Sequence, residues 1–265
     1  MDSINPKFSI LSLTLGQSNF RWSAIESVLQ QDYGSWELIL IDPSSETFID
    51  SRVQELIDKD ERVVCIDTPD SGPAQGLNNG LQRATGEFVL CLNGDDFILK
   101  DCLQKVANIV DSEMTDDFAV IHGNSILVDE KSTKVKLLFS DHISILNFSS
   151  GEYALPHPST FYRREFLAAN NIDFNERNRT CWDAEITLNI LQCGGRFLRM
   201  NEFLSAFRLH PNSISGSGAL TAEYDNEKKR ILSAAKEIES HSALRLNATA
   251  LFLILKRKLR LWKSK

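Results

Sequence analysis

The chain is organised around one stretch, Gly86-Glu87-Phe88-Val89-Leu90-Cys91-Leu92-Asn93-Gly94-Asp95-Asp96-Phe97. In this stretch an apolar run passes directly into an acidic turn. Phe88 to Leu92 predicts a strand in the interior of a parallel sheet, where both faces are covered. Open α/β sheets bind ligands in the crevice outside the carboxyl ends of their strands. Carboxylate and amide oxygens there suit a hard divalent cation that also contacts substrate phosphates. The stretch therefore predicts a metal–diphosphate site, and a polar turn that caps the next helix is the alternative.

The sequence before this stretch alternates between strand and helix patterns. Strands are expected over residues 8–15, 36–41 and 62–66, and helices over 20–31, 49–57 and 73–84. This alternation predicts a mostly parallel sheet covered by helices, and hence an α/β fold.

The sequence after the acidic turn has a mixed pattern. We expect helices over 99–110, 164–169 and from 182 to the Gly194-Gly195 pair, and strands over 118–122, 125–128, 134–139, 159–162, 196–200 and 203–209. The two segments 125–128 and 134–139 are predicted to form a hairpin. Gly216-Ser217-Gly218 is the clearest linker. The pattern from residue 220 onward is helical, so we predict a domain over 1–216 and a helical extension over 217–265.

Composition and charge exclude several classes of protein. The chain has 42% apolar and 25% charged residues, which is typical of a globular protein. Its net charge of −7 argues against nucleic-acid binding. The five cysteines form no C-x-x-C pair, so neither a zinc site nor a disulfide framework is expected. No secretory signal is visible, and we expect a cytoplasmic protein.

The C-terminal residues carry a separate pattern. Apolar residues between 244 and 262 fall on one helical face, and residues 256–265 hold six basic residues without an acid. The longest apolar run, 248–255, is well short of the ~20 residues that a spanning helix needs. A basic amphipathic helix with Trp262 predicts contact with an anionic membrane surface. A terminal helix that packs on the domain and ends in a solvated basic tail is the alternative.

Polar residues lie at or just after the carboxyl end of each of the first four predicted strands. They are Thr14, Asp42, Asp70 and the Asn93–Asp96 turn. Because the carboxyl ends of parallel strands share one edge of a sheet, these residues are expected to line one crevice. Neither a G-x-G-x-x-G fingerprint nor a Walker loop is present, which argues against NAD and P-loop chemistry.

Several motifs together carry a resemblance to a known family. They are Ala24–Tyr33, Trp36–Asp42, Asp70-Ser71-Gly72, Leu77–Gly80, Ala84–Glu87, Leu92–Asp96, His157–Arg164, Trp182–Glu185, Phe207–His210, Ser213 and Ser215. In this order and spacing, over about residues 7–215, the chain resembles the inverting family 2 glycosyltransferases of the GT-A fold. It is especially similar to bacterial enzymes that build surface polysaccharide or lipid-linked oligosaccharide.

The resemblance implies a GT-A domain, Rossmann-like, with a nucleotide-sugar half over about 1–98 and an acceptor half over about 99–216. It implies a nucleotide-diphosphate sugar donor, a saccharide or lipid-linked acceptor, and Mn²⁺ or Mg²⁺ as cofactor. The protein would then work at the inner face of the cytoplasmic membrane as a peripheral protein.

The resemblance also implies roles for individual residues. Asp183 would be the general base for the acceptor hydroxyl, and Asp95 would hold the metal with His210 beside it. The nucleotide-sugar site would consist of Thr14, Asp42, Asp70, Asn78, Asn93 and Gly94. Asp183 as an N-cap and His210 as a structural loop residue are the alternatives.

The chain departs from the family pattern in the donor half. Asn93 stands where the family commonly has an acid, and Asn79 stands where it often has lysine. These departures leave a catalytically weak homologue, which binds a nucleotide sugar, a partner or a membrane, as an alternative function. A nucleotidyltransferase is a further alternative, although the loop 16–19 lacks the basic residue typical of that class.

Overall fold

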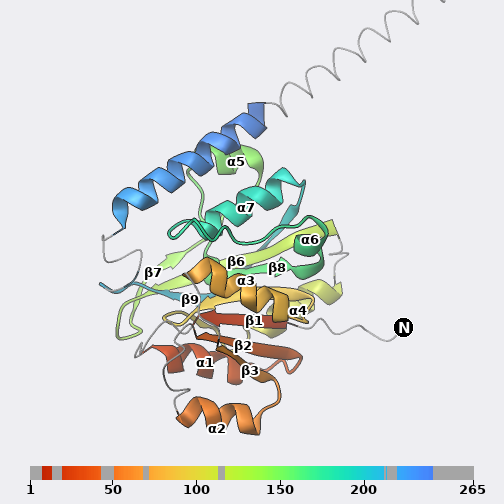
Figure 1. The fold of residues 1–265 in the computed structure, drawn as a ribbon, viewed down its shortest axis with the longest axis vertical. Coiled ribbons are helices and arrows are strands. Elements are labelled where there is room, and N and C mark those ends of the chain that lie inside the picture. Colours follow the sequence, from red (N-terminus) through yellow and green to blue (C-terminus); the bar gives the residue numbers. More distant parts are fainter. Residues whose placement is uncertain are drawn as a thin grey trace, which may run out of the picture.

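The computed structural model contains one sheet with helices on both of its faces (Figure 1). It describes residues 8–13, 20–42, 51–67, 72–112, 117–211, 213 and 220–240. The strands are β1 (Phe8–Leu13), β2 (Trp36–Asp42), β3 (Val63–Asp67), β4 (Phe88–Asn93), β5 (Phe97–Ile98), β6 (Phe118–Val128), β7 (Lys134–Leu138), β8 (Thr160–Arg163) and β9 (Arg196–Arg208). The helices are α1 (Arg21–Leu29), α2 (Ser51–Lys59), α3 (Pro73–Arg83), α4 (Cys102–Ser112), α5 (Ile145–Ser150), the 3-10 helix η2 (His157–Ser159), α6 (Arg164–Ala169), α7 (Trp182–Gln192) and a helix over residues 221–240.

The first four long strands form the parallel part of the sheet, in the order β3-β2-β1-β4. Every residue of β1 is buried, and β4 is buried up to its last residue. This burial on both faces explains the continuous apolar run over 88–92, and it confirms the predicted interior strand. In the register of the sheet, Leu13 lies opposite both Ile41 and Asn93. The strand ends therefore share one edge.

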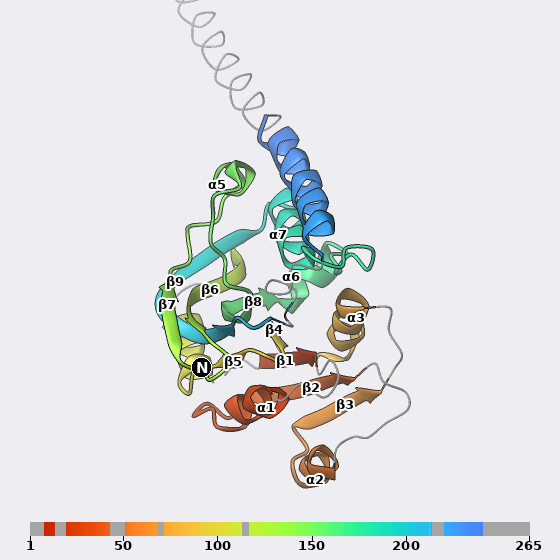
Figure 2. The same cartoon turned by 90° about the vertical axis from the view of Figure 1, so that its left-hand side faces the viewer.

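The rest of the sheet is mixed. Strand β8 pairs antiparallel with β4 and β6, β9 runs parallel to β6, and β5 pairs antiparallel with β9. The predicted hairpin is confirmed as β6–β7. Figure 2 shows β7 beside β6 and β9 on the side of the molecule away from α3.

The predicted breaks within β6 and β9 were wrong. The sequence suggested separate strands before and after Gly123 and before and after residues 201–202, but each pair is one long strand with shifts in register. A Cβ atom on Gly123 would lie 2.8 Å from the carbonyl oxygen of Glu202. Gly123 thus allows close approach of β6 to β9 and does not end a strand.

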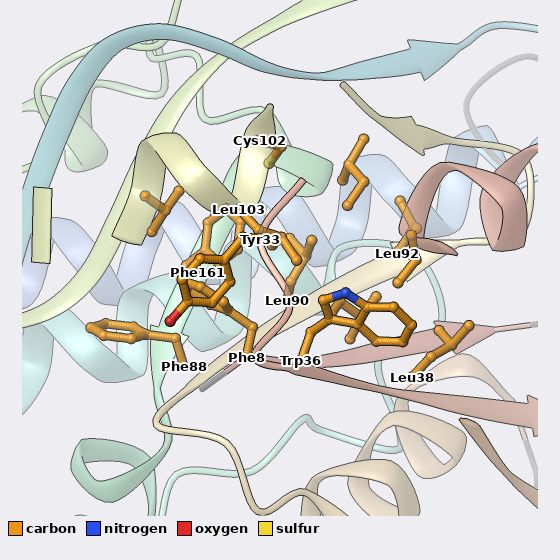
Figure 3. Packing of buried hydrophobic residues seen from close by; sticks show 14 of the residues in the cluster. Phe8, Tyr33, Trp36, Leu38, Phe88, Leu90, Leu92, Cys102, Leu103 and Phe161 are labelled. Atoms are coloured by element: carbon orange, nitrogen blue, oxygen red, sulfur yellow. The ribbon is translucent and has the colours of Figure 1, made fainter. Parts of the chain in front are cut away.

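Alternate residues of the strands supply two apolar cores, one on each face of the sheet. On one face Phe8, Leu90 and Trp36 pack with α1 and α4, and Figure 3 shows this cluster with Leu103 and Phe161. On the other face the strands pack against α3, α6 and α7. Burial of both faces is the main source of stability for such a layered fold.

The helix over 221–240 lies across α5 and α7 at the far end of the molecule from α2 (Figure 1). Its residues Ile231 and Ala235 are buried against Phe148, Cys181 and Leu188. This helix lies within the predicted extension over 217–265, and the division of the chain into a domain and an extension stays a prediction. The predicted membrane-contacting segment over 242–265, the Gly216–Gly218 linker, Thr14 and Asp70 lie outside the described residues. Within the part of the chain that the structure describes, every helix is too short or too polar to cross a bilayer.

Candidate functional site

The acidic turn begins where β4 ends. The backbone N–H of Asp96 donates to the carbonyl of Asn93 at 3.1 Å, and the chain then enters β5. Gly94 is buried within this turn. The side chain of Asp96 is 1% exposed, and it accepts a 2.9 Å hydrogen bond from the backbone of Arg208. Asp96 therefore holds the turn in place and does not face the solvent.

Burial raises the pKa of Asp96 well above its usual range, and the nearby Asp95 carboxylate acts in the same direction. The amide nitrogen of Asn93 lies 3.4 Å from the Asp96 carboxylate. This contact leaves the carbonyl oxygen of the Asn93 side chain for a ligand.

Arg208 connects the acidic turn to the β6–β7 hairpin. The residue ends β9 and is 1% exposed. Its Nε donates to the backbone carbonyl of Asp95 at 2.8 Å, and its Nη1 donates to the carbonyl of Asp129 at 3.1 Å and to Ser132 Oγ at 2.9 Å. Its guanidinium carbon also lies 4.4 Å from the ring centroid of Phe20.

Burial and nearby acids act in opposite directions on the pKa of Arg208. Burial lowers its pKa, whereas Asp96, Asp95 and Asp129 act to raise it. The sequence does not predict Arg208 as a site residue, although it stands two residues before His210 in a motif that carries the family resemblance. The available signal was an arginine that directly follows the apolar pair Ala206-Phe207 at the end of the strand.

His210 and Asp95, the two predicted metal residues, are in contact. His210 Nε2 lies 3.0 Å from Asp95 Oδ2, and the two side chains are 11% and 26% exposed. The Phe20 ring packs on His210 with 5.1 Å between the ring centroids. A carboxylate, an imidazole and the carbonyl of Asn93 are together suitable ligands for a divalent cation such as Mn²⁺.

The described residues contain no group of three or more His, Cys, Asp or Glu side chains arranged to hold a metal. A cation at Asp95 and His210 would therefore take its remaining ligands from substrate phosphates and water, as Mg²⁺ commonly does. The residues present fit such a shared site, and the metal remains a prediction.

Asp183 lies in the first turn of α7, and its environment disagrees with the alternative interpretation as an N-cap. Cys181 occupies the N-cap position, and the carboxylate of Asp183 belongs to the second residue of the helix. The side chain is half-buried. It lines a pocket of about 310 Å³ together with Asn93, Trp182 and Phe207. Asn93 of the acidic turn and the predicted base thus line the same pocket.

Glu185, the second acid in this turn of α7, is engaged by other protein groups. Asn178 Nδ2 donates to it at 2.7 Å, Asn175 Nδ2 at 3.0 Å, and Arg230 of the helix over 221–240 pairs with it at 2.7 Å. Burial acts to raise the pKa of Glu185, but these hydrogen bonds more than offset that effect and lower it. Asp183 is therefore the acid of this helix that is available to a substrate.

The other predicted donor residues have different environments. Asp42 ends β2 at the same sheet edge as Asn93 and is half-buried. Asn78 lies in α3 and is buried, and its amide exchanges two 2.9 Å hydrogen bonds with the backbone of Phe174. These bonds give Asn78 a structural role in holding the 174–176 segment against α3.

The sequence matches a known family model. A model described as Glycosyl transferase family 2 matches residues 20–171, which is more than half of the chain. The match contains the acidic turn and ends before α7.

Individual relatives agree with that match. An uncharacterized glycosyltransferase of Haemophilus influenzae is 33% identical over 146 residues, covering 53% of this chain and 57% of the relative. A GalNAc(5)-diNAcBac-PP-undecaprenol beta-1,3-glucosyltransferase of Campylobacter jejuni is 31% identical over 127 residues, 47% of this chain and 40% of the relative. The putative teichuronic acid biosynthesis glycosyltransferase TuaG of Bacillus subtilis is 26% identical over 235 residues, 82% and 84% of the two chains. The chain therefore spans less than two thirds of the first two relatives.

Two solved structures have a similar fold. S. aureus TarS 1–349 in complex with UDP-GlcNAc has a TM-score of 0.64 at 19% identity, covering 86% of this chain and 66% of TarS. The mannosyltransferase PcManGT of Pyrobaculum calidifontis, in complex with GDP-Man and Mn²⁺, has a TM-score of 0.59 at 15% identity, covering 97% and 83%. These likenesses confirm the predicted α/β fold of the GT-A type.

Proposed function

The chain belongs to glycosyl transferase family 2, and from this membership we propose that it moves a sugar from a nucleotide-diphosphate donor to a saccharide acceptor with inversion at the anomeric carbon. The observation that carries the proposal is that Asn93 of the acidic turn and Asp183 of α7 line one pocket. A donor-binding turn and a carboxylate base on the same pocket are the two parts that a direct displacement requires.

The donor end of this reaction belongs to the acidic turn. Asp95 and His210 would hold a divalent cation, with the carbonyl of Asn93 as a neutral further ligand. A bound cation offsets the negative charge that develops on the leaving diphosphate. Arg208 and Asp96 keep the turn in the geometry that presents Asp95.

The acceptor end of the reaction belongs to Asp183. Its carboxylate accepts the proton of the acceptor hydroxyl as that oxygen forms a bond to the anomeric carbon. The bond between the anomeric carbon and the diphosphate oxygen breaks, and its electron pair leaves with the nucleotide diphosphate. Because the acceptor attacks from the side opposite the leaving group, a single displacement inverts the anomeric configuration.

The relatives support a role in bacterial surface polysaccharide synthesis. TuaG is named for teichuronic acid biosynthesis, and the Campylobacter relative is named for an acceptor linked to PP-undecaprenol. We propose a saccharide acceptor that is lipid-linked, and peripheral contact of residues 242–265 with the inner face of the cytoplasmic membrane. UDP- and GDP-sugars are the first donors to test, since TarS and PcManGT are solved with such donors.

The test begins with donor binding by the full chain. Thermal unfolding is measured with Mn²⁺ and UDP-, GDP- and dTDP-sugars, because a ligand that binds the folded state raises the unfolding temperature. Asp95→Ala is expected to abolish the Mn²⁺-dependent part of that rise. Retained activity of Asp95→Ala, or activity under chelation, would remove the cation from the mechanism.

The second step of the test concerns the base. Asp183→Asn is expected to bind the donor normally and to lose transfer to the acceptor by about 100-fold or more. Glu165→Gln is a matched control, because Glu165 is an exposed acid in the first turn of α6. Near-normal turnover by Asp183→Asn would refute its role.

A non-catalytic donor-binding protein is the second candidate function. It is favoured by the neutral Asn93 at the metal turn and by Asn79, which stands where the family often has lysine. Donor binding without turnover on any saccharide or lipid-linked acceptor would support it.

A further inference from the structure

His157 is a buried histidine without a hydrogen-bond partner. The residue begins η2 and is 8% exposed, and neither of its ring nitrogens contacts a donor or an acceptor among the described residues. Its neighbours are fully engaged, since Ser159 Oγ donates to the carbonyl of Asn124 at 2.8 Å and Thr160 Oγ1 donates to that of Pro156 at 2.9 Å. Buried polar groups are almost always hydrogen-bonded in folded proteins. An unpartnered buried imidazole is therefore a candidate for ligand binding where the residue also lines a pocket.

The position of His157 places that ligand in the proposed active site. His157 lines the 310 Å³ pocket together with Asn93 and Asp183. Its ring meets the ring of Trp182 edge to face, with 4.5 Å between the centroids. Trp182 directly precedes Asp183, so the same turn of α7 positions both the imidazole and the carboxylate.

A second buried histidine provides the contrast. His122 also has two unpartnered ring nitrogens, but it is 0% exposed and packs against Phe197. It is not among the residues that line the pocket. His122 is a core residue, whereas His157 lines the pocket that Asn93 and Asp183 also line.

The protonation state of His157 suits an uncharged ligand. Burial lowers the pKa of its imidazole, although the Asp183 carboxylate acts in the opposite direction. A neutral imidazole has one donor nitrogen and one acceptor nitrogen. A sugar hydroxyl, which can both donate and accept, is complementary to either nitrogen.

We propose that His157 is a sugar-binding residue of this pocket, with one ring nitrogen hydrogen-bonded to a hydroxyl group of a sugar that lies between Asn93 and Asp183. This inference rests on the proposed function, because it assigns a sugar to the same pocket. Donor and acceptor sugars both carry such hydroxyls, and the kinetics of each substrate separate the two sources. His157 positions the substrate, and Asp183 remains the residue that takes the proton.

The test uses two substitutions of different chemistry. His157→Phe keeps a ring against Trp182 and removes both nitrogens, so its thermal unfolding temperature is expected to be equal to or above that of the wild type. Its kcat/KM is expected to fall about 10- to 100-fold, the range for a lost hydrogen bond in a buried site. His157→Gln, which can still donate and accept, is expected to restore part of that loss. His122→Phe is the matched control and is expected to leave kcat/KM unchanged.

A deoxy-sugar comparison separates binding from a purely structural effect. The donor that the wild type turns over is compared with its monodeoxy analogues, and the same is done for the acceptor. Removal of one hydroxyl should lower the kcat/KM of the wild type about 10-fold or more. The same removal should lower the kcat/KM of His157→Phe little, because the hydrogen-bond partner of that hydroxyl is already absent. The substrate that shows this coupling is the sugar that His157 binds.

Three outcomes overturn the inference in different ways. Unchanged kcat/KM in His157→Phe would refute the role of His157 and leave the proposed function intact. A loss of activity without coupling to any hydroxyl, and without rescue in His157→Gln, would show that the histidine is structural. Absence of turnover by the wild type with every donor would overturn the proposed function and this inference with it.

Discussion

Replacing His122 is expected to make the protein more resistant to acid. His122 lies in β6 at 0% exposure without a hydrogen-bond partner. Burial lowers its pKa from an ordinary value of 6.5 to about 4, and the nearby Arg199 and His142 side chains act in the same direction. The unfolded chain therefore binds a proton near pH 6.5, whereas the folded chain binds it only near pH 4. Because the unfolded state holds more protons in this window, stability falls as the pH falls.

The size of this effect follows from the two pKa values. Each pH unit between them is worth about 1.4 kcal/mol for one fully titrating group. When the pH falls from the ordinary pKa to the pKa in the folded protein, the free energy of unfolding thus decreases by about 3 kcal/mol. This is a substantial part of the roughly 5–15 kcal/mol that stabilises a typical domain.

The assay is urea unfolding at several pH values from about 7 to about 4.5, a range that covers most of the window. The wild type is compared with His122→Phe, which keeps a ring against Phe197, and with His122→Asn, which has a smaller side chain that does not titrate. All other titrating groups, including Asp96, contribute to each protein alike. The difference in stability between wild type and variant should therefore shift by about 2–3 kcal/mol in favour of the variant as the pH falls. Stability curves that stay parallel to within about 0.5 kcal/mol would refute the reasoning.

Three further substitutions test the site and the fold. Arg208→Met should lower the free energy of unfolding by about 3–5 kcal/mol in urea titrations, since it removes a buried charge from its partners, while Arg196→Met at an exposed ion pair should cost under about 1 kcal/mol. Gly86→Ala should cost about 1–3 kcal/mol, because its Cβ would lie 2.6 Å from a backbone nitrogen, and Gly34→Ala, with nothing within 4 Å, is the control. Asn93→Asp should tighten Mn²⁺ binding in calorimetry by adding a charged ligand, and unchanged affinity would contradict a metal at this turn.

The donor half of the fold could be predicted because its information is local. The run over 88–92 is apolar because β4 is covered on both faces, and the polar residues after it are placed by the strand itself. Parallel pairing then brings Asp42 and Asn93 to the same edge, as the register of β1 requires. The errors in β6 and β9 have a local cause as well. A glycine such as Gly123 within an apolar run usually suggests the end of a strand. Here the glycine is explained by the close approach of the Glu202 backbone, which is visible only in the structure.

The contacts that define the site could not be predicted, because they join distant parts of the chain. Arg208 contacts Asp96 across 112 residues, and Asn78 contacts the backbone of Phe174 across 96. Nothing near Asn78 in the sequence distinguishes an amide that binds a substrate from one that fastens a loop. His157 was visible only as part of a motif, because its lack of partners is a property of the packed structure.

Asp95 and Asp96, the two adjacent acids of the acidic turn, have different environments because Arg208 contacts them differently. The backbone N–H of Arg208 binds the side chain of Asp96, and its guanidinium binds the backbone carbonyl of Asp95. The side chain of Asp96 is thus buried and hydrogen-bonded inside the protein, while the side chain of Asp95 is 26% exposed beside His210. The same arrangement recurs in α7, where Glu185 is bound by protein groups and Asp183 is left toward the pocket. In each turn one acid is held by other protein groups, and the second acid is the one that we propose for chemistry. This explains why removing a structural acid should damage catalysis through geometry, and removing its neighbour should damage it directly.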